Sequence, residues 1–236
     1  MPEYLITGGL GRLGSELCGK LSAVAPASTE LDILDEKQIA DCLRACPVNA
    51  ILHLAAIADS AACERDKPRS YLVNVMGTAN MARAAKQFQK KLVYISTDYV
   101  FPGTRGEYAE SDAPSPANWY GFTKYAGELE IQNRTENHLI IRTAFRPSLW
   151  PFKSAYDNVL SSADYVDVIG REILLALSLN LTGLVHIGTA PKTLFELARL
   201  RNPDIVPESA PAHFPKRKDF SLKRWEEIKK QARAAA

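Results

Sequence analysis

The sequence has no long hydrophobic run and no large excess of charge of one sign. No apolar stretch approaches the roughly 20 residues that a membrane-spanning helix needs, and the first residues lead into a strand pattern instead of a signal peptide. The formal net charge is +2, with both signs mixed along the 236 residues. The composition therefore calls for neither nucleic acid nor an anionic membrane as a partner, and we expect a cytoplasmic globular protein.

Cysteine is scarce, and its four copies lack the paired spacings of a metal site. We therefore expect no bound metal. Cys42 and Cys46 lie four residues apart, which allows a redox pair, although packing is the more frequent role of such cysteines in a cytosolic protein. Internal repeats and low-complexity segments are also missing. A chain of this length can bury a large core, so we expect one domain, or one domain with a small lobe.

A glycine-rich turn near the N-terminus is the first positive signal. The apolar segment Tyr4-Leu5-Ile6-Thr7 is followed by Gly8-Gly9-Leu10-Gly11-Arg12-Leu13-Gly14 and then by a helical pattern to about Ala23. Such a turn lets backbone N–H groups approach a pyrophosphate at the start of a helix. Its place between a strand and a helix favours dinucleotide binding over a merely tight turn. Arg12 either faces the 2′-phosphate of NADP or points into solvent.

Several further apolar segments end in small or polar residues. Residues 49–54 lead into Ala55-Ala56, residues 91–101 contain Ser96-Thr97, and residues 138–143 form another apolar run. Helical patterns separate these segments, which predicts an α/β fold with a parallel sheet and crossover helices. Ligands of such sheets bind beyond the carboxyl ends of the strands. The glycine turn, Ala55-Ala56 and Ser96-Thr97 all fall at such ends, and this agreement is the main support for one shared site.

Tyr120 and Lys124 begin a predicted helix and share one of its faces. An ammonium beside a phenol favours the phenolate and lowers the tyrosine pKa towards neutrality, so the tyrosine can give or take a proton. The Tyr-x-x-x-Lys spacing alone is common on ordinary helix faces, and its weight depends on the rest of the chain.

Other elements are predicted in outline. We expect a poorly marked second strand at residues 23–27, a helix at residues 36–45 capped by Asp35 with Gln38 behind it, and a long helix at residues 69–87. Within these elements, His53 suits a packed role better than a catalytic one, and Asn74 either faces the active site or is satisfied by backbone. Beyond Thr143 we expect an irregular wall to Asp164, helices at residues 166–177, 192–199 and 221–236, a late strand at residues 183–187, and mostly loop at residues 202–215.

Taken together, four stretches resemble the extended short-chain dehydrogenases/reductases and, within them, the dTDP-4-dehydrorhamnose reductase family. The resemblance is good for about residues 3–145 and looser beyond. Its pieces are Thr7-Gly8-Gly9-Leu10-Gly11-Arg12-Leu13-Gly14, Leu31-Asp32-Ile33, Ser96-Thr97-Asp98-Tyr99-Val100-Phe101 and Asn118-Trp119-Tyr120-Gly121-Phe122-Thr123-Lys124. In the related sugar-nucleotide dehydratases an acid pair follows the threonine, whereas here Tyr99 follows Asp98. The resemblance therefore implies reduction and not dehydration.

The resemblance also implies an architecture and a mechanism. It implies a Rossmann-type doubly wound parallel sheet at residues 1–145 and a smaller substrate-binding region at residues 146–236 that partly returns to the core sheet. Hydride would pass from the nicotinamide to the C4 ketone of a nucleotide-linked 6-deoxyhexose. Thr97 would hydrogen-bond the reacting oxygen, Tyr120 would protonate it, and Lys124 would hold the nicotinamide ribose and lower the tyrosine pKa.

The expected ligand contacts combine the residue patterns with the resemblance. NADP(H) is slightly favoured over NAD(H), and the substrate is expected to be a nucleotide sugar. The expected cofactor contacts are Gly8, Gly11, Arg12, Leu13, Gly14, Asp32, Ile33, Ala55, Ala56, Tyr120, Lys124 and Phe145. The expected substrate contacts are Asp98, Tyr99 and Arg217.

Departures from the family leave alternatives open. The chain is shorter than typical members between Thr143 and Asp164 and at its C-terminus, and the arginine-proline signature is reduced to Lys216-Arg217-Lys218-Asp219. This basic cluster either clamps a diphosphate or is solvated. The alternatives in function are a sugar-nucleotide epimerase with tightly held NAD and a non-catalytic NADP-binding regulatory subunit, because the regulatory subunit of methionine adenosyltransferase resembles the same family. The sequence leaves a homodimer open.

Overall fold

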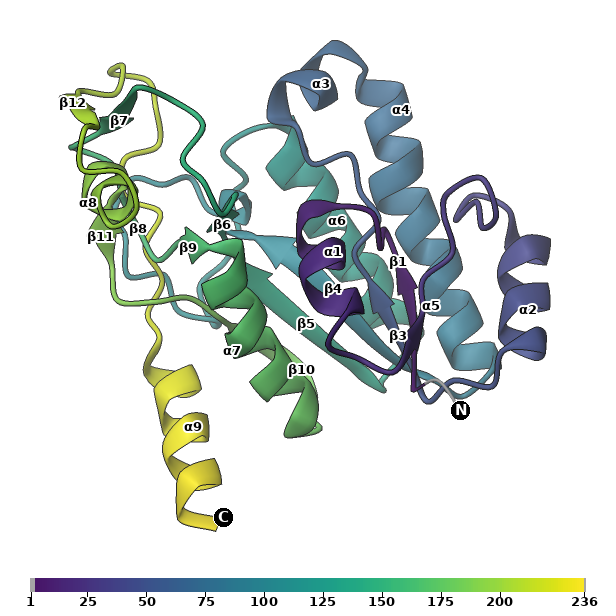
Figure 1. Ribbon diagram of the computed structural model, residues 1–236. Coiled ribbons are helices and arrows are strands. Elements are labelled where there is room, and N and C mark those ends of the chain that lie inside the picture. Colours follow the sequence, from purple (N-terminus) through teal and green to yellow (C-terminus); the bar gives the residue numbers. More distant parts are fainter. Residues whose placement is uncertain (1–2, 236) are drawn as a thin grey trace. The chain divides into compact units, whose positions relative to one another are not determined.

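The computed structural model describes residues 3–235, and these form two compact units (Figure 1). Unit 1 comprises the chain up to Ser96, together with Asn118–Ile141 and Leu181–Leu184. Unit 2 comprises Thr97–Ala117, Arg142–Asn180 and the chain from Val185 onward. Each unit combines three separate segments of the sequence, because segments that are distant in the chain pack together within it. The functional division into residues 1–145 and 146–236 stays a prediction.

A six-stranded sheet, most of whose residues belong to unit 1, has the strand order β10-β5-β4-β3-β1-β2. The β1–β2, β1–β3 and β3–β4 pairs are parallel, and the four residues of β3 are all buried, as expected when a sheet is covered on both faces. The order reverses at β1, with β2 on one side and β3 on the other, which confirms the predicted doubly wound α/β fold of Rossmann type. The strands are β1 Tyr4–Thr7, β2 Ala23–Val24, β3 Ala50–His53, β4 Lys91–Thr97, β5 His138–Thr143 and β10 Gly183–His186.

The helices of unit 1 are α1 Arg12–Cys18, α2 Glu36–Ala45, α3 Ser60–Arg65, α4 Lys67–Tyr71, α5 Thr78–Gln87 and α6 Trp119–Arg134. Asp35 caps α2 as predicted, accepting hydrogen bonds from the backbone N–H groups of Lys37 and Gln38. The side chain of Gln38 accepts instead from the N–H of Asp32. Helix α1 ends earlier than predicted, at Cys18, because the chain must turn at Gly19 before β2 begins.

The predicted helix at residues 69–87 is interrupted by a π-helical segment, Leu72–Gly77, between α4 and α5. Two close contacts are made within this wider turn. Asn74 is drawn to the backbone of Ile57 by two hydrogen bonds, and Gly77 lies so close to Ile33 that an added Cβ would be 2.6 Å from its Cδ1 atom. In Figure 1, α4 continues through this turn into α5, which packs beside α6.

The core of unit 1 fills the space between the sheet and its helices, with Leu5, Ile51, Leu92 and Tyr94 among its fully buried members. Cys42 and Cys46 lie at its edge as partly buried packing residues. All four cysteines are free thiols, and burial raises the pKa of the Cys42 thiol. The i,i+4 pair therefore packs in this structure and forms no disulfide.

In its described residues, unit 2 is built from short strand pairs, three α-helices and the 3-10 helix Asp98–Val100. Parallel pairing joins β6 Phe145–Arg146 with β9 Asp164–Tyr165 and β7 Ser154–Tyr156 with β12 Val206–Glu208, and antiparallel pairing joins β8 Leu160–Ser161 with β11 Lys192–Thr193. The helices are α7 Val166–Ser178, α8 Leu194–Arg199 and α9 Lys223–Ala235. The segment expected to be an irregular wall thus contains paired strands. These strands were missed because segments of two or three residues are too short to show alternation. Within residues 3–235, no helix has the length and apolarity to cross a membrane.

Candidate functional site

The glycine turn joins β1 to α1 with the close approaches that its sequence pattern predicts. Gly8 has φ +72°, a conformation that favours glycine, and its carbonyl accepts a hydrogen bond of 3.0 Å from the N–H of Gly11. A Cβ at Gly8 would be 2.7 Å from the backbone nitrogen of Ala55. The turn therefore lies directly against the end of β3. The start of α1 has no side-chain cap, which suits it to an anionic group as its partner.

Gly14 is the glycine of this turn that tolerates a side chain least. A Cβ there would be 2.3 Å from the carbonyl oxygen of Gly8 and 2.6 Å from that of Gly9. We expect Gly14→Ala to lower the free energy of unfolding by about 3 kcal/mol or more, because neither carbonyl can move without disrupting the turn. Gly19→Ala is the matched control, since its Cβ would meet nothing within 4 Å. Denaturant unfolding of both variants checks the prediction, which fails if they unfold at the same denaturant concentration.

The remaining cofactor candidates of unit 1 differ in exposure. Arg12 is exposed in the turn and Leu13 behind it is buried. Asp32 is exposed, with one carboxylate oxygen accepting from the N–H of Leu34. Ile33 is buried, and its carbonyl accepts from the side chain of Asn80. Ala55 and Ala56 are half-buried after β3. Arg12 and Asp32 are therefore the two that present charge to solvent.

Tyr120 and Lys124 occupy the first two turns of α6. Asn118 caps this helix by accepting from the N–H of Gly121 at 2.8 Å. Tyr120 is half-buried, whereas Lys124 is only 3 % exposed, and its Nζ lies 3.9 Å from the ring centroid of Tyr94. Burial lowers the pKa of Lys124 to about 7, against the opposing electrostatic effect, first of Glu128 and then of Cys63. The lysine is therefore poised to change charge near neutral pH.

His53 supports this site from β3 as a packed, neutral side chain. Burial and the charge of Lys124 lower its pKa to about 3. Thr78 donates its hydroxyl proton to the carbonyl of Asn74, so it can only accept from Nε2 of His53, at 3.0 Å. Nδ1 then accepts from the hydroxyl of Thr7 at 2.7 Å. Both ring nitrogens are thereby satisfied, which agrees with the packed role favoured by the sequence.

Asn74 has its polar atoms satisfied inside unit 1. Its side-chain oxygen accepts from the N–H of Ile57 at 2.8 Å, and its amide donates to the carbonyl of Ile57 and to the hydroxyl of Thr123, both at 3.0 Å. Thr123 in turn donates to the carbonyl of Tyr120 at 2.8 Å. Of the two roles left open, the structure shows the backbone-satisfied one, and this chain of bonds ties the π-helical turn to the start of α6.

Thr97 ends β4 and belongs to unit 2 together with Asp98 and Tyr99. Its hydroxyl donates to Oδ1 of Asp98 at 3.1 Å and accepts from the N–H of Tyr99 at 3.3 Å. Oδ2 of Asp98 lies 3.4 Å from the Nζ of Lys218, which in turn lies 4.1 Å from the ring centroid of Tyr99. Asp98 and Lys218 are 3 % and 1 % exposed. A buried hydroxyl–carboxylate–ammonium series thus lies at the strand end.

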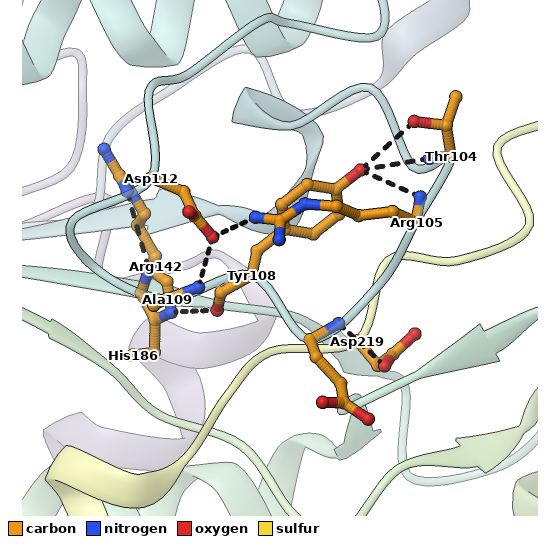
Figure 2. Close-up of polar contacts among 9 residues, drawn as sticks. Thr104, Arg105, Tyr108, Ala109, Asp112, Arg142, His186 and Asp219 are labelled. Carbon is orange, nitrogen blue, oxygen red and sulfur yellow. Dashed lines mark hydrogen bonds and ion pairs between the residues drawn. The ribbon is translucent and has the colours of Figure 1, made fainter.

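Lys218 was missed as a site residue, because only its place in a basic cluster marked it in the sequence. Arg217, the predicted member of that cluster, instead pairs with the buried carboxylate of Asp219, with Nε at 3.2 Å from Oδ1. Figure 2 shows Asp219 also accepting from the loop that follows β4, at the N–H of Glu107. The structure therefore brings Asp98 and Tyr99 together with Lys218 rather than with the side chain of Arg217. Phe145 is half-buried in β6.

The loop after β4 is held by its own hydrogen bonds (Figure 2). The phenol oxygen of Tyr108 accepts from the N–H groups of Thr104 and Arg105 at 3.0 and 3.3 Å, and Asp112 accepts from the N–H of Ala109 at 2.7 Å. His186 lies beneath, with Nδ1 3.1 Å from the carbonyl oxygen of Tyr108. The loop is thus fixed within unit 2, and this polar cluster is structural support that sequence patterns did not reveal.

Comparison with known proteins gives this arrangement a context. The family model of the RmlD substrate binding domain matches residues 2–158. The dTDP-4-dehydrorhamnose reductase of Salmonella typhimurium is 35 % identical over 152 residues, covering 61 % of this chain and 51 % of that protein. The methionine adenosyltransferase 2 subunit beta of Xenopus laevis is 32 % identical over 151 residues, covering 58 % and 45 %. The chain thus spans about half the length of these two relatives.

A solved structure matches the whole chain. The crystal structure of dTDP-4-dehydrorhamnose reductase from Bacillus anthracis in complex with NADP aligns with a TM-score of 0.84 and 26 % identity, covering 100 % of this chain and 98 % of that one. The likeness therefore extends through both units, beyond the region that the family model matches.

Proposed function

The chain belongs to the RmlD substrate binding domain family, and we propose that it is an NAD(P)H-dependent reductase of a 4-keto sugar nucleotide, of the short-chain dehydrogenase type. The similar reductases from Salmonella and Bacillus motivate the reaction class. The observation that carries the proposal is the buried Lys124 one turn beyond Tyr120, with its pKa lowered to about 7. A lysine at that position can tune the acidity of a neighbouring phenol.

The glycine turn is the element proposed to hold the cofactor. Gly8, Gly11 and Gly14 let the turn lie against β3, and the uncapped start of α1 favours a pyrophosphate. Beside the glycine turn, the cofactor would also contact Leu13, Ile33, Ala55 and Ala56. The exposed Asp32 would accept a hydrogen bond from a ribose hydroxyl. The exposed Arg12 favours NADP(H) over NAD(H), because its guanidinium can pair with a 2′-phosphate.

The proposed chemistry assigns one task to each catalytic residue. Bound NAD(P)H supplies the hydride. Tyr120 gives its phenolic proton to the oxygen of the substrate ketone, Thr97 hydrogen-bonds that oxygen, and Lys124 holds the nicotinamide ribose while favouring the phenolate of Tyr120. The sugar nucleotide would be contacted by Asp98, Tyr99 and Arg217, and Phe145 would lie beside the nicotinamide.

Ligand-induced stabilisation tests this proposal. A ligand that binds only the folded state at 100 times its Kd stabilises it by about 2.7 kcal/mol, which raises Tm by about 5–10 °C for a chain of this size. We expect such a shift with NADPH, a smaller one with NADH, and a further rise when dTDP or UDP is added. Arg12→Ala should reduce the NADPH shift and leave the NADH shift unchanged, because only NADPH carries the 2′-phosphate.

Each contrary outcome identifies an alternative. A cofactor shift without a nucleotide effect would keep the dehydrogenase and discard the nucleotide sugar. Retention of NAD through purification would favour an epimerase. No shift with any dinucleotide would reject the proposed cofactor site.

A second candidate is a non-catalytic regulatory subunit, which the similarity to the methionine adenosyltransferase subunit from Xenopus favours. Dinucleotide binding without turnover of any 4-keto sugar nucleotide would support it. The presence of Thr97, Tyr120 and Lys124 together favours the reductase, since a regulatory role needs none of their chemistry.

A further inference from the structure

Glu128 lies one turn beyond Lys124 on the buried face of α6, so Tyr120, Lys124 and Glu128 recur at intervals of four residues along one helix. The carboxylate of Glu128 is 1 % exposed. It accepts a hydrogen bond from the hydroxyl of Ser96, which β4 places directly before Thr97. The proposed hydride and proton transfers do not use this buried acid.

A buried ammonium needs a compensating charge, because removing it from water is costly. The ionisable groups that act on Lys124 or on its neighbour Tyr94 are Glu128 and Tyr120 from α6, Cys63 from α3 and Tyr94 itself from β4, and Lys124 in turn acts on His53 of β3. Tyr94 offers Lys124 the face of its ring, burial raises its own pKa well above the ordinary value, and His53 is neutral. Glu128 is the carboxylate of this group, and of the two groups that raise the pKa of Lys124 it has the larger effect. Burial raises the pKa of the Cys63 thiol.

Gly127 allows this arrangement. A Cβ at that position would be 2.6 Å from the phenol oxygen of Tyr94, so only glycine lets α6 pack this closely on β4. The close contact brings the Tyr94 ring beneath Lys124 and the Ser96 hydroxyl to Glu128. The arrangement around Lys124 therefore depends on both α6 and β4, because Ser96 of β4 holds the carboxylate of Glu128 on α6.

We propose that Glu128 is a positioning residue that keeps the ammonium of Lys124 charged beside Tyr120, with Ser96 holding its carboxylate in place. The catalytic part of this inference rests on the proposed function. A neutral lysine could not favour the phenolate of Tyr120 and would lose its charge as a donor to the cofactor ribose. Glu128 would thus set the pH range in which the Tyr–Lys pair works.

The pH dependence of stability tests the charge coupling without any assay of activity. The folded pKa of Lys124 is about 7, below its ordinary 10.5, so the unfolded chain binds the extra proton between these values and stability rises with pH through this window. Glu128→Gln keeps an acceptor for Ser96 but removes the charge. We expect the rise to begin about one to three pH units lower in this variant. Denaturant unfolding from pH 5 to pH 10 measures it.

Matched variants test whether the change in the pH dependence of stability comes from the interaction between Glu128 and Lys124. In Lys124→Met the rise of stability with pH that Lys124 causes should vanish. Adding Glu128→Gln to this variant should not change the pH dependence of stability any further in that window. Ser96→Ala removes the hydrogen bond and keeps the carboxylate, so we expect the rise in stability to begin at a lower pH than in the wild type, but to be shifted less than in Glu128→Gln. Equal onsets in Glu128→Gln and the wild type would overturn the proposal.

Turnover provides the second measurement. For Glu128→Gln we expect kcat at pH 8 to fall about tenfold or more, with the loss shrinking as the pH is lowered to the reduced pKa of Lys124, where the ammonium is restored. Glu128→Asp, which restores the charge, should recover activity at pH 8. A loss that is the same at every pH would indicate a structural role alone. Absence of reductase activity in the wild type would reject the proposed function, while the stability series would still decide whether Glu128 charges Lys124.

Discussion

Replacing Tyr120 with phenylalanine is expected to lower kcat by about a hundredfold to ten-thousandfold, the usual contribution of a positioned general acid. The variant loses only the phenolic oxygen. The cap of α6 is the side chain of Asn118, and Thr123 donates to the backbone carbonyl of residue 120, so neither hydrogen bond involves the phenol. Lys124 stays buried one turn further on. We therefore expect α6 to fold unchanged. Steady-state oxidation of NADPH with a 4-keto sugar nucleotide measures the loss.

Two controls separate chemistry from structure in that experiment. The NADPH-induced rise in Tm should be nearly the same in Tyr120→Phe and the wild type, because the glycine turn is untouched. Tyr125→Phe removes a phenol from a half-buried position on the same helix and should keep turnover within about threefold of the wild type, as no proton transfer is assigned to it. Unchanged turnover in Tyr120→Phe would refute the mechanism proposed above.

Replacing Lys218 with methionine is expected to cost about 3–5 kcal/mol of stability, the usual cost of leaving one partner of a buried ion pair uncompensated. Asp98 would remain buried without its cation, and the ring of Tyr99 would lose the ammonium that lies 4.1 Å from its centroid. For a chain of this size the loss corresponds to a Tm lower by about 10 °C. Thermal and denaturant unfolding both measure it.

The double variant Lys218→Met with Asp98→Asn should recover most of that stability, because it removes both charges and keeps a polar acceptor beside Thr97. Lys223→Met changes an exposed lysine and should stay within about 0.5 kcal/mol of the wild type. If Lys218→Met unfolds like the wild type, the ion pair between Asp98 and Lys218 does not stabilise the protein, and the prediction is wrong.

The sequence by itself determined the features that depend on neighbours a few residues away. The glycine turn follows from the close approach that only Gly8 and Gly14 permit. The cap of α2 follows from Asp35, whose carboxylate reaches the N–H groups two and three residues on. The pairing of Tyr120 with Lys124 on one face follows from helical spacing. These local rules, repeated along the chain, predicted a parallel sheet with crossover helices, and the family resemblance implied that the sheet is doubly wound.

Tertiary structure decided what depends on residues distant in the sequence. The sequence cluster Lys216-Arg217-Lys218 does not indicate which cation is buried; packing places Lys218 against Asp98 and leaves Arg217 to Asp219. The π-helical turn at Asn74 depends on the backbone of Ile57, and the fixed carboxylate of Glu128 depends on Ser96 of a different element. Burial also sets the pKa of Lys124. Desolvation and long-range pairing depend on the folded surroundings of a group, and no pattern of adjacent residues encodes them.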